Sequence, residues 1–184
     1  MKVTKTSLDG VLQLTPKMFE DERGFFFESF NAQIFDQVME YAVHFVQDNH
    51  SRSNFGVLRG LHYQMDPRAQ GKLVRVVQGS VFDVAVDLRR GSPTLGQWYA
   101  EVLSAENHLQ LWIPAGFAHG FLTLSDTAEM LYKTTATYAP ECERCIVWND
   151  PDLAIAWPEL GFSPQLSEKD LQGVLFREAE LFDY

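Results

Sequence analysis

Residues 72–88 read KLVRVVQGSVFDVAVDL, and this stretch decides the expected fold. Two apolar or alternating runs, 72–78 and 81–88, are separated by Gln78-Gly79-Ser80, where the glycine can supply a positive φ. The pattern predicts a tight hairpin of two strands. On the second strand, Asp83 and Asp87 alternate with apolar neighbours, so one face carries carboxylates and Asp83 can anchor a buried network.

Similar short runs, bounded by Gly, Pro, Asn and Asp, fill most of the chain. We expect further strands near 11–14, 24–30, 43–49, 56–64, 97–103, 109–113, 118–125, 128–138 and 145–149. Asn31 can cap one helix that runs to about Tyr41, and a second short helix can begin at Ser167. This series predicts an antiparallel β-sandwich or barrel with little helix, forming a single domain over residues 1–184.

Charge and hydropathy exclude several classes of partner. The formal net charge is −10, whereas nucleic-acid binding needs a basic surface. No stretch approaches the roughly 20 apolar residues of a membrane helix, and Met1 to Asp9 lacks the apolar core of a signal peptide. We therefore expect a cytoplasmic protein that binds neither nucleic acid nor membrane.

Cys142 and Cys145 form a lone Cys-Glu-Arg-Cys, which is compatible with a redox pair or with half of a zinc site. A structural zinc ion needs four ligands, and a redox pair should open a helix. Because Cys145 leads instead into a predicted strand, two reduced thiols are the favoured interpretation.

A first candidate for chemistry is His62, in the predicted strand that ends at Gln64. Strand alternation aims Leu58, His62 and Gln64 at one face. Arg59 falls on the opposite face unless Gly60 allows a bulge. A lone histidine here is more often a hydrogen-bonded core residue than a catalyst.

His119 and two tyrosines are the next candidates. His119 begins a strand after a turn that contains Pro114 and Gly116, where it can cap backbone carbonyls or serve a site. Tyr132 and Tyr138 share one face at strand spacing, as core aromatics or as proton donors. An imidazole and a phenol together can transfer protons on two faces of a substrate.

Several cations could hold an anionic ligand such as a diphosphate, although each is also a plausible solvated surface charge: Arg23, Arg59 and Lys72. Two histidines on separate strands also suggest a metal site. A metal-binding barrel is expected to carry His-x-His, however, and Gln64 occupies the second position after His62. A metal-free site is therefore favoured, with metal catalysis as the alternative.

With these residues assembled, the chain closely resembles the dTDP-4-dehydrorhamnose 3,5-epimerase family of cupin jelly rolls. The matching stretches are 21–30, 45–51, 56–64, 70–75, 82–89, 113–121, 131–135 and 167–170. The resemblance implies an all-β, cupin-type antiparallel jelly-roll barrel with a few short helices. It also implies a reaction without a metal or a redox cofactor.

The resemblance assigns roles residue by residue. His62 would be the base, Asp170 its carboxylate partner and Tyr132 the opposing acid, while Lys72 would stabilise an enolate. Asp170 could also form a helix capping box with Ser167, and both roles can hold together. The residues that would contact the sugar nucleotide are Arg23, Glu28, Gln47, Asn49, Arg59, Lys72, His119, Glu143 and Lys169, with Tyr138 stacked on the thymine.

The implied reaction inverts C3 and C5 of dTDP-4-dehydro-6-deoxy-D-glucose, giving dTDP-4-dehydro-L-rhamnose for dTDP-L-rhamnose biosynthesis. The family resemblance further implies a homodimer that exchanges the strand containing Phe25 to Phe27; the alternative is one strand buried on both faces. Cys142 and Ala136 depart from the family pattern, near the rim of the expected site. Three other functions remain open: a metal-dependent cupin, a non-catalytic sugar-nucleotide binding module, and a relative that epimerises only C3 or moves the ketone.

Overall fold

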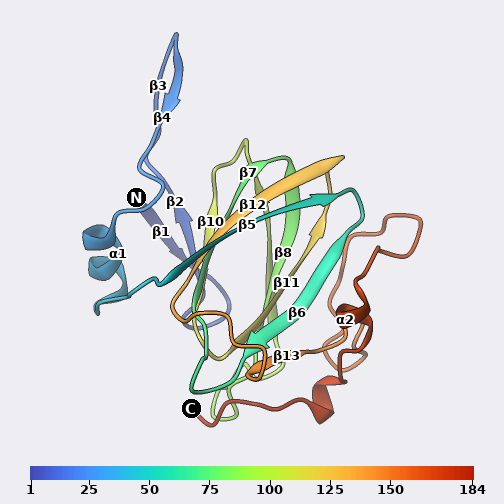
Figure 1. The fold of residues 1–184 in the computed structure, drawn as a ribbon. Coiled ribbons are helices and arrows are strands. Elements are labelled where there is room, and N and C mark those ends of the chain that lie inside the picture. Colours follow the sequence, from blue (N-terminus) through green and yellow to red (C-terminus); the bar gives the residue numbers. More distant parts are fainter.

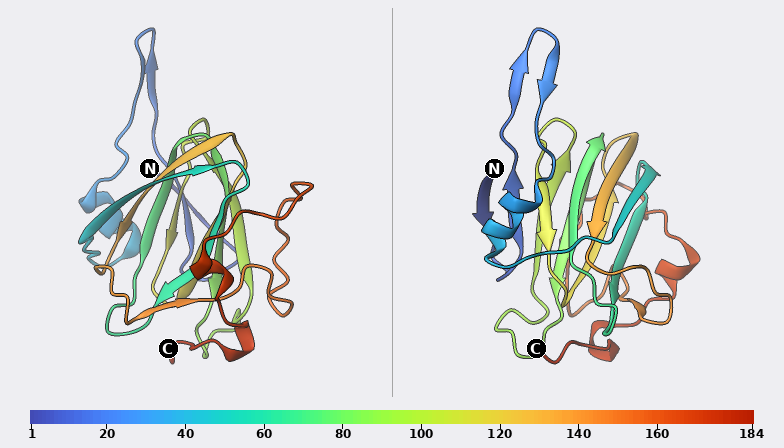
Figure 2. Two further views of the ribbon diagram at one scale, coloured as in Figure 1. Left: turned by 45° about the vertical axis from the view of Figure 1, so that its right-hand side comes forward. Right: turned by 60° about the vertical axis from the view of Figure 1, so that its left-hand side comes forward.

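The chain folds into two antiparallel β-sheets that face each other, with little helix, as expected (Figure 1). The computed structural model describes residues 1–184. One sheet has six strands in the order β1-β2-β10-β7-β12-β5, and the other has five in the order β13-β6-β11-β8-β9. A separate two-stranded hairpin, β3-β4, projects from one corner (Figure 2).

The elements have the following bounds. The strands are β1 (Lys2–Lys5), β2 (Leu12–Thr15), β3 (Phe19–Asp21), β4 (Gly24–Phe26), β5 (Gln47–Asn54), β6 (Leu58–Gln64), β7 (Lys72–Gln78), β8 (Ser80–Asp87), β9 (Trp98–Ser104), β10 (Gln110–Ile113), β11 (Phe117–Thr123), β12 (Thr127–Thr134) and β13 (Glu143–Cys145). The helices are α1 (Ala32–Met39), α2 (Glu168–Leu171) and a 3₁₀ turn, Phe176–Glu178. No helix is long and apolar enough to cross a membrane.

The turn at Gly79 does not form the predicted hairpin. Gly79 has φ +69°, as its sequence context predicts, and both flanking strands are present. However, β7 pairs with β10 and β12, whereas β8 pairs with β11 and β9 in the opposite sheet. The turn therefore carries the chain from one sheet to the other, because alternation of side chains fixes a strand's faces but not its partners.

Four other predicted strands have different bounds, and two strands were not expected. The strand predicted at 43–49 runs from Gln47 to Asn54, and the one at 128–138 stops at Thr134. Only residues 24–26 of 24–30 are extended in a ladder, and 145–149 is replaced by β13. β5 has the sequence QDNHSRSN, so it lacks the apolar alternation that marks a strand. The two strands that were not expected are β1 and β3, which are short and also lack this alternation.

The two helices follow their predicted caps. The Asn31 side chain accepts a hydrogen bond from the Ile34 amide, and Phe35 packs against Trp112 on the outer face of the six-stranded sheet. Burying such a ring is worth about 1.5–3 kcal/mol. The helix ends at Met39, two residues before the predicted end at Tyr41, and Tyr41 is exposed.

The main core lies between the sheets. The buried side chains that meet there include Val74, Val76, Leu111 and Met130 from the six-stranded sheet and Val81, Ala85, Phe117 and Phe121 from the five-stranded one. A second cluster lies on the outer face of the five-stranded sheet, where the C-terminal segment inserts Phe182. The segment is also held by the Tyr63 hydroxyl, which donates to the Glu180 carbonyl over 2.9 Å.

The β3-β4 hairpin is apolar but exposed. Phe25 and Phe26 are 60% and 66% exposed. The strand is therefore not buried on both faces within this chain, and that alternative is wrong.

Candidate active site

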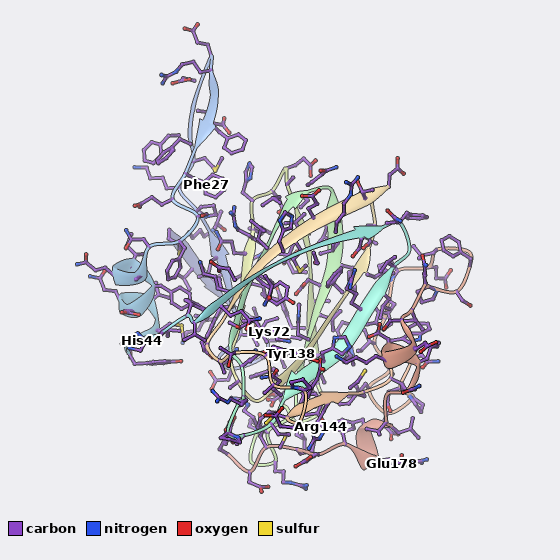
Figure 3. All side chains as sticks on the ribbon, viewed as in Figure 1. Phe27, His44, Lys72, Tyr138, Arg144 and Glu178 are labelled. Atoms are coloured by element: carbon purple, nitrogen blue, oxygen red, sulfur yellow. The ribbon has the colours of Figure 1, made fainter.

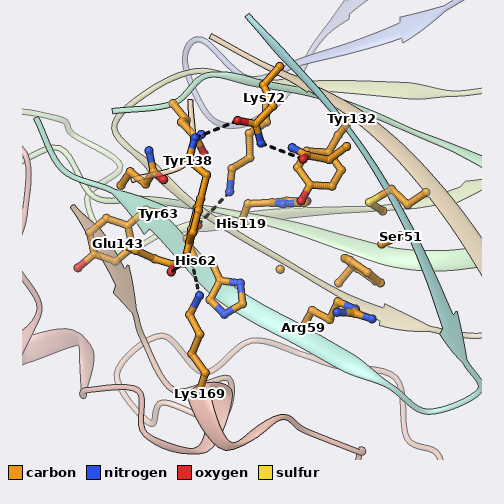
Figure 4. A pocket seen from close by; sticks show the side chains of 17 residues that line it. Ser51, Arg59, His62, Tyr63, Lys72, His119, Tyr132, Tyr138, Glu143 and Lys169 are labelled. Carbon is orange, nitrogen blue, oxygen red and sulfur yellow. Dashed lines mark hydrogen bonds and ion pairs between the residues drawn. The ribbon is translucent and has the colours of Figure 1, made fainter. Parts of the chain in front are cut away.

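A cavity of about 410 Å³ opens between the two sheets (Figure 4). It is lined by Gln47, Asn49 and Ser51 of β5, Arg59, His62, Tyr63 and Gln64 of β6, Gln70, Lys72 of β7, His119, Gly120 and Phe121 of β11, Met130 and Tyr132 of β12, Tyr138, Glu143 and Lys169. Ten of the predicted site residues thus line this one cavity, and His62 and Tyr132 come from different sheets. Figure 3 shows Lys72 and Tyr138 in this region, far from Phe27 on the hairpin.

A bulge at Gly60 brings Arg59 to the cavity. His119 pairs with His62 and Phe121 with Arg59, so β6 has two residues between these pairs, Gly60 and Leu61, where β11 has only Gly120. The extra residue reverses the alternation and places Arg59 on the same face as His62. Leu58 then points away with Leu122, toward a separate groove, so the prediction that it shares the face of His62 is wrong.

Only glycine fits at this bulge. Gly60 has φ +124°, and a Cβ there would lie 2.5 Å from the Gly120 Cα and 2.8 Å from the His119 carbonyl oxygen. Two strands therefore approach closely where the site residues change face.

His62 is held against Asp170. Its Nε2 lies 2.7 Å from Oδ1 of Asp170, which is 3% exposed on α2. Burial alone would raise the pKa of Asp170, but the His62 imidazole, the Ser167 hydroxyl and the Gly60 amide together lower that pKa well below its usual range. Asp170 also completes the capping box with Ser167, so both predicted roles are structurally compatible. An ionised carboxylate at Nε2 leaves Nδ1 as the free ring nitrogen.

Lys72 is a buried cation at the start of β7. Its side chain is buried, and Nζ donates to the His62 carbonyl oxygen over 3.2 Å. Burial lowers the pKa of Lys72 to about 8, although Asp83 and Glu143 act in the opposite direction. The ammonium group is thus charged at neutral pH but poorly solvated, which strengthens its attraction for an anionic oxygen.

Tyr132 faces the cavity from β12. Burial raises the pKa of its phenol, with Arg59 lowering it and Glu143 raising it to smaller extents. The phenol therefore keeps its proton near neutral pH and can act as a donor.

His119 is fixed by Asp83, which is completely buried. The His119 Nε2 lies 2.9 Å from Oδ2 of Asp83. This confirms that Asp83 anchors a buried network, and it fixes the orientation of a ring that lines the cavity.

Tyr138, Glu143 and Lys169 form the rim. The Tyr138 hydroxyl donates to Glu143 over 2.7 Å, and Lys169 forms an ion pair with the same carboxylate. Burial raises the pKa of Glu143, but Lys169 and Tyr138 lower it, with a net decrease. The Tyr138 ring remains 53% exposed, so one face is accessible to a planar group.

Glutamines hold the loop that carries Tyr138, a function that sequence reasoning missed. The Gln47 Oε1 accepts from the Tyr138 amide, Gln64 binds the Thr137 carbonyl and the Ala139 amide, and Gln70 donates to the Ala136 carbonyl. Strand alternation places Tyr138 correctly at the cavity, although the strand has already ended. Gln64, which occupies the second position of the His-x-His pattern, forms hydrogen bonds with backbone groups of this loop.

Arg23 and Glu28 do not reach this cavity. Arg23 is exposed on the hairpin beside Asp21, and Glu28 accepts a hydrogen bond from Asn31 at the base of the hairpin. Both lie outside the lining of the cavity in the same chain.

Both cysteines are free thiols, as expected, but Cys145 lies beside the candidate base. The β13-β6 register places Cys145 opposite His62. One ligand atom from each of His62, Cys145 and Asp170 lies within 4.8 Å of the others. The group does not follow the His-x-His pattern of a single strand, because its members come from β6, β13 and α2.

Comparison with known proteins identifies relatives along nearly the whole chain. A family model described as dTDP-4-dehydrorhamnose 3,5-epimerase matches residues 5–178. The dTDP-4-dehydrorhamnose 3,5-epimerase of Pseudomonas aeruginosa is 63% identical over 182 residues, which cover 99% of each chain.

Solved structures agree with this finding and with the predicted jelly-roll class. A Legionella pneumophila dTDP-6-deoxy-D-glucose-3,5-epimerase in complex with dTDP-4-keto-L-rhamnose is 51% identical with a TM-score of 0.95, covering 100% of this chain and 98% of that one. A 3'-monoepimerase of Streptomyces bikiniensis in complex with dTDP-quinovose is 35% identical with a TM-score of 0.89, covering 94% and 86%.

Proposed function

The chain belongs to the dTDP-4-dehydrorhamnose 3,5-epimerase family and is an epimerase, and we propose that its cavity inverts C3 and C5 of dTDP-4-dehydro-6-deoxy-D-glucose by proton transfer between His62 and Tyr132. The product is dTDP-4-dehydro-L-rhamnose, the precursor of dTDP-L-rhamnose. The observation that carries the mechanism is that His62 and Tyr132 line one cavity from opposite sheets.

His62 removes the proton next to the ketone. The neutral imidazole accepts it at Nδ1, and the C–H electron pair moves into the carbonyl to form an enolate. Asp170 stabilises the resulting imidazolium through Nε2. The Lys72 ammonium stabilises negative charge on the enolate oxygen, which narrows the acidity gap between the carbon acid and the base.

Tyr132 returns a proton to the same carbon from the other face. The phenol donates its proton as the enolate returns to the ketone, so the configuration at this carbon is inverted. His62 then carries one extra proton and Tyr132 lacks one, and exchange with solvent restores both side chains. A second cycle at the other carbon completes the double epimerisation.

Local cations bind the nucleotide against the overall charge of −10. Arg59 and Lys169 line the cavity mouth and are suited to the diphosphate, while the exposed face of Tyr138 is suited to stacking on thymine. Gln47, Asn49, His119 and Glu143 supply hydrogen bonds to the sugar.

A second copy of the chain completes the site. The exposed Phe25 and Phe26 need cover, and Arg23 and Glu28 lie beyond the reach of their own cavity. A homodimer that exchanges the hairpin covers these rings and delivers the two polar side chains to the partner.

Proton NMR in deuterium oxide tests the reaction. With dTDP-4-dehydro-6-deoxy-D-glucose, label should appear at both C3 and C5, and the rate should be unaffected by a chelator. Label at C3 alone would identify a 3-epimerase. Loss of rate with a chelator would identify a metal-dependent enzyme, and the absence of any exchange would identify a binding module. Each of these results would refute the double epimerisation as proposed.

Mixing inactive variants tests the exchanged dimer. His62→Ala and Arg23→Ala dimers should each be inactive or weak, but subunit exchange should restore activity, because one mixed site carries neither change. A mixture no more active than its components, although exchange is verified by tagged copies, would exclude delivery of Arg23 to a partner site.

A further inference from the structure

The neighbours of His62 form a second chemical arrangement around its buried nitrogen. Cys145 lies opposite His62 in the β13-β6 ladder, and α2 brings Asp170 against the same ring. The His62 Nε2 is shielded from solvent and makes no well-directed hydrogen bond, despite its short distance to Asp170. We call these three residues the His62–Cys145–Asp170 cluster.

Imidazole nitrogen, thiolate sulfur and carboxylate oxygen are the ligands that zinc prefers. Bonds of about 2.0–2.3 Å in a tetrahedron keep ligand atoms about 3–4 Å apart. The three ligand atoms already lie within 4.8 Å of one another, so side-chain movements of about 1 Å would suffice. The fourth position can be taken by water, as in open zinc sites.

We propose that the His62–Cys145–Asp170 cluster is an inhibitory site for Zn²⁺ or a similar thiophilic divalent cation. The inference rests on the proposed function only in that His62 is the base. Binding releases the thiol proton of Cys145 to solvent, and the three side chains then hold the ion through sulfur, nitrogen and oxygen.

Inhibition follows from the tautomer of the imidazole. In the active enzyme, Nε2–H faces Asp170 and the lone pair of Nδ1 accepts the substrate proton. An ion on Nε2 of the neutral ring moves the ring proton to Nδ1, where it blocks the base. Asp170 is also withdrawn from its role beside the imidazolium.

The surrounding charges permit a dication. Asp170 and Glu143 are acidic, and Lys169 neutralises one of these charges through its pair with Glu143. Ions that prefer oxygen ligands bind thiolate sulfur weakly, so Mg²⁺ is a control for selectivity.

The first test measures epimerisation with Zn²⁺ alone added to chelator-treated enzyme. The wild type should be inhibited at micromolar Zn²⁺, should recover with chelator and should be insensitive to Mg²⁺. Cys145→Ser should keep its basal rate but need at least about tenfold more Zn²⁺, since loss of even an outer-shell partner costs roughly 10–100-fold in affinity. Cys142→Ser, which changes the thiol outside the cluster, should behave like the wild type.

The second test needs no substrate. Co²⁺ should produce a thiolate-to-cobalt charge-transfer band in the near ultraviolet with the wild type and Cys142→Ser, but not with Cys145→Ser. Absence of the band in the wild type, its persistence in Cys145→Ser, or equal Zn²⁺ inhibition of both enzymes would overturn the inference. An enzyme without epimerase activity that still showed the Cys145-dependent band would refute the proposed function and retain the metal site.

Discussion

Replacing Lys72 by methionine should make the protein more stable while removing most of its activity. Met has a similar length and no charge, so it can occupy the buried space beside His62 without desolvating an ammonium group. The same change removes the cation that stabilises the enolate. Stability and activity should therefore move in opposite directions.

The magnitude follows from the pKa of Lys72, which falls from 10.5 to about 8 through burial. Each factor of ten in acidity is worth about 1.4 kcal/mol, so the charged form costs the fold about 3 kcal/mol. Loss of the hydrogen bond from Nζ to the His62 carbonyl destabilises the variant by about 1 kcal/mol and offsets part of this gain. A net gain of about 2 kcal/mol should raise Tm by about 4–8 °C in a chain of this size, while kcat should fall by about 10²–10³.

Thermal unfolding across pH isolates this group. Below pH 8, lysine is charged in both states and the full difference between variant and wild type is present. Between pH 8 and 10.5 the native state loses its proton first, so the unfolded state binds more protons and the wild type gains relative stability. The gap in Tm should close over this range.

Lys2→Met, at an exposed position on β1, should leave Tm nearly unchanged and serves as the control. A Lys72→Met variant that is less stable than wild type, or a gap that does not narrow with pH, would refute this account. So would full activity without the lysine.

Three further substitutions test other parts of the site. Tyr132→Phe should lower kcat for inversion by about 10²–10⁴, measured by NMR, and a variant with more than half of wild-type activity would remove Tyr132 as the acid. Asp170→Asn should lower kcat at least about 100-fold. Because the pKa of Asp170 is lowered in the native state, the contribution of this carboxylate to the stability of the fold is lost as the pH falls through the carboxyl range. Acid should therefore reduce the stability of the variant less than that of the wild type. Gly60→Ala should destabilise the fold by about 3 kcal/mol or more in chemical denaturation, whereas Gly91→Ala, whose added Cβ meets nothing within 4 Å, should change stability by less than about 0.5 kcal/mol; equal effects would contradict the close approach at the bulge.

Sequence reasoning located the chemistry better than it located the strand pairings. Side-chain alternation brought His62 and Tyr132 to an interior face, because a period of two survives in any sheet arrangement. It could not tell that the turn at Gly79 changes sheets, since partner choice depends on packing of residues far apart in the chain. Arg59 needed the bulge at Gly60, which the sequence allowed but did not require.

Other features were hidden for different physical reasons. The polar strand β5 has no apolar period, although its Gln47 and Asn49 line the cavity. Cys145 seemed to belong with Cys142, but register with β6 makes His62 its relevant neighbour. The family resemblance supplied Asp170 as the partner of His62, a contact across more than a hundred residues that no local pattern contains.

His62 and Tyr132 lie in separate sheets, so the packing between the sheets sets the distance between these two side chains. The spacing of the two sheets determines how far each side chain lies from its face of the sugar. That spacing depends on side chains between the sheets, such as Met130 and Phe121. Evolution could thus retune the stereochemical outcome by changing the volume of inert hydrocarbon, without altering any group that exchanges a proton.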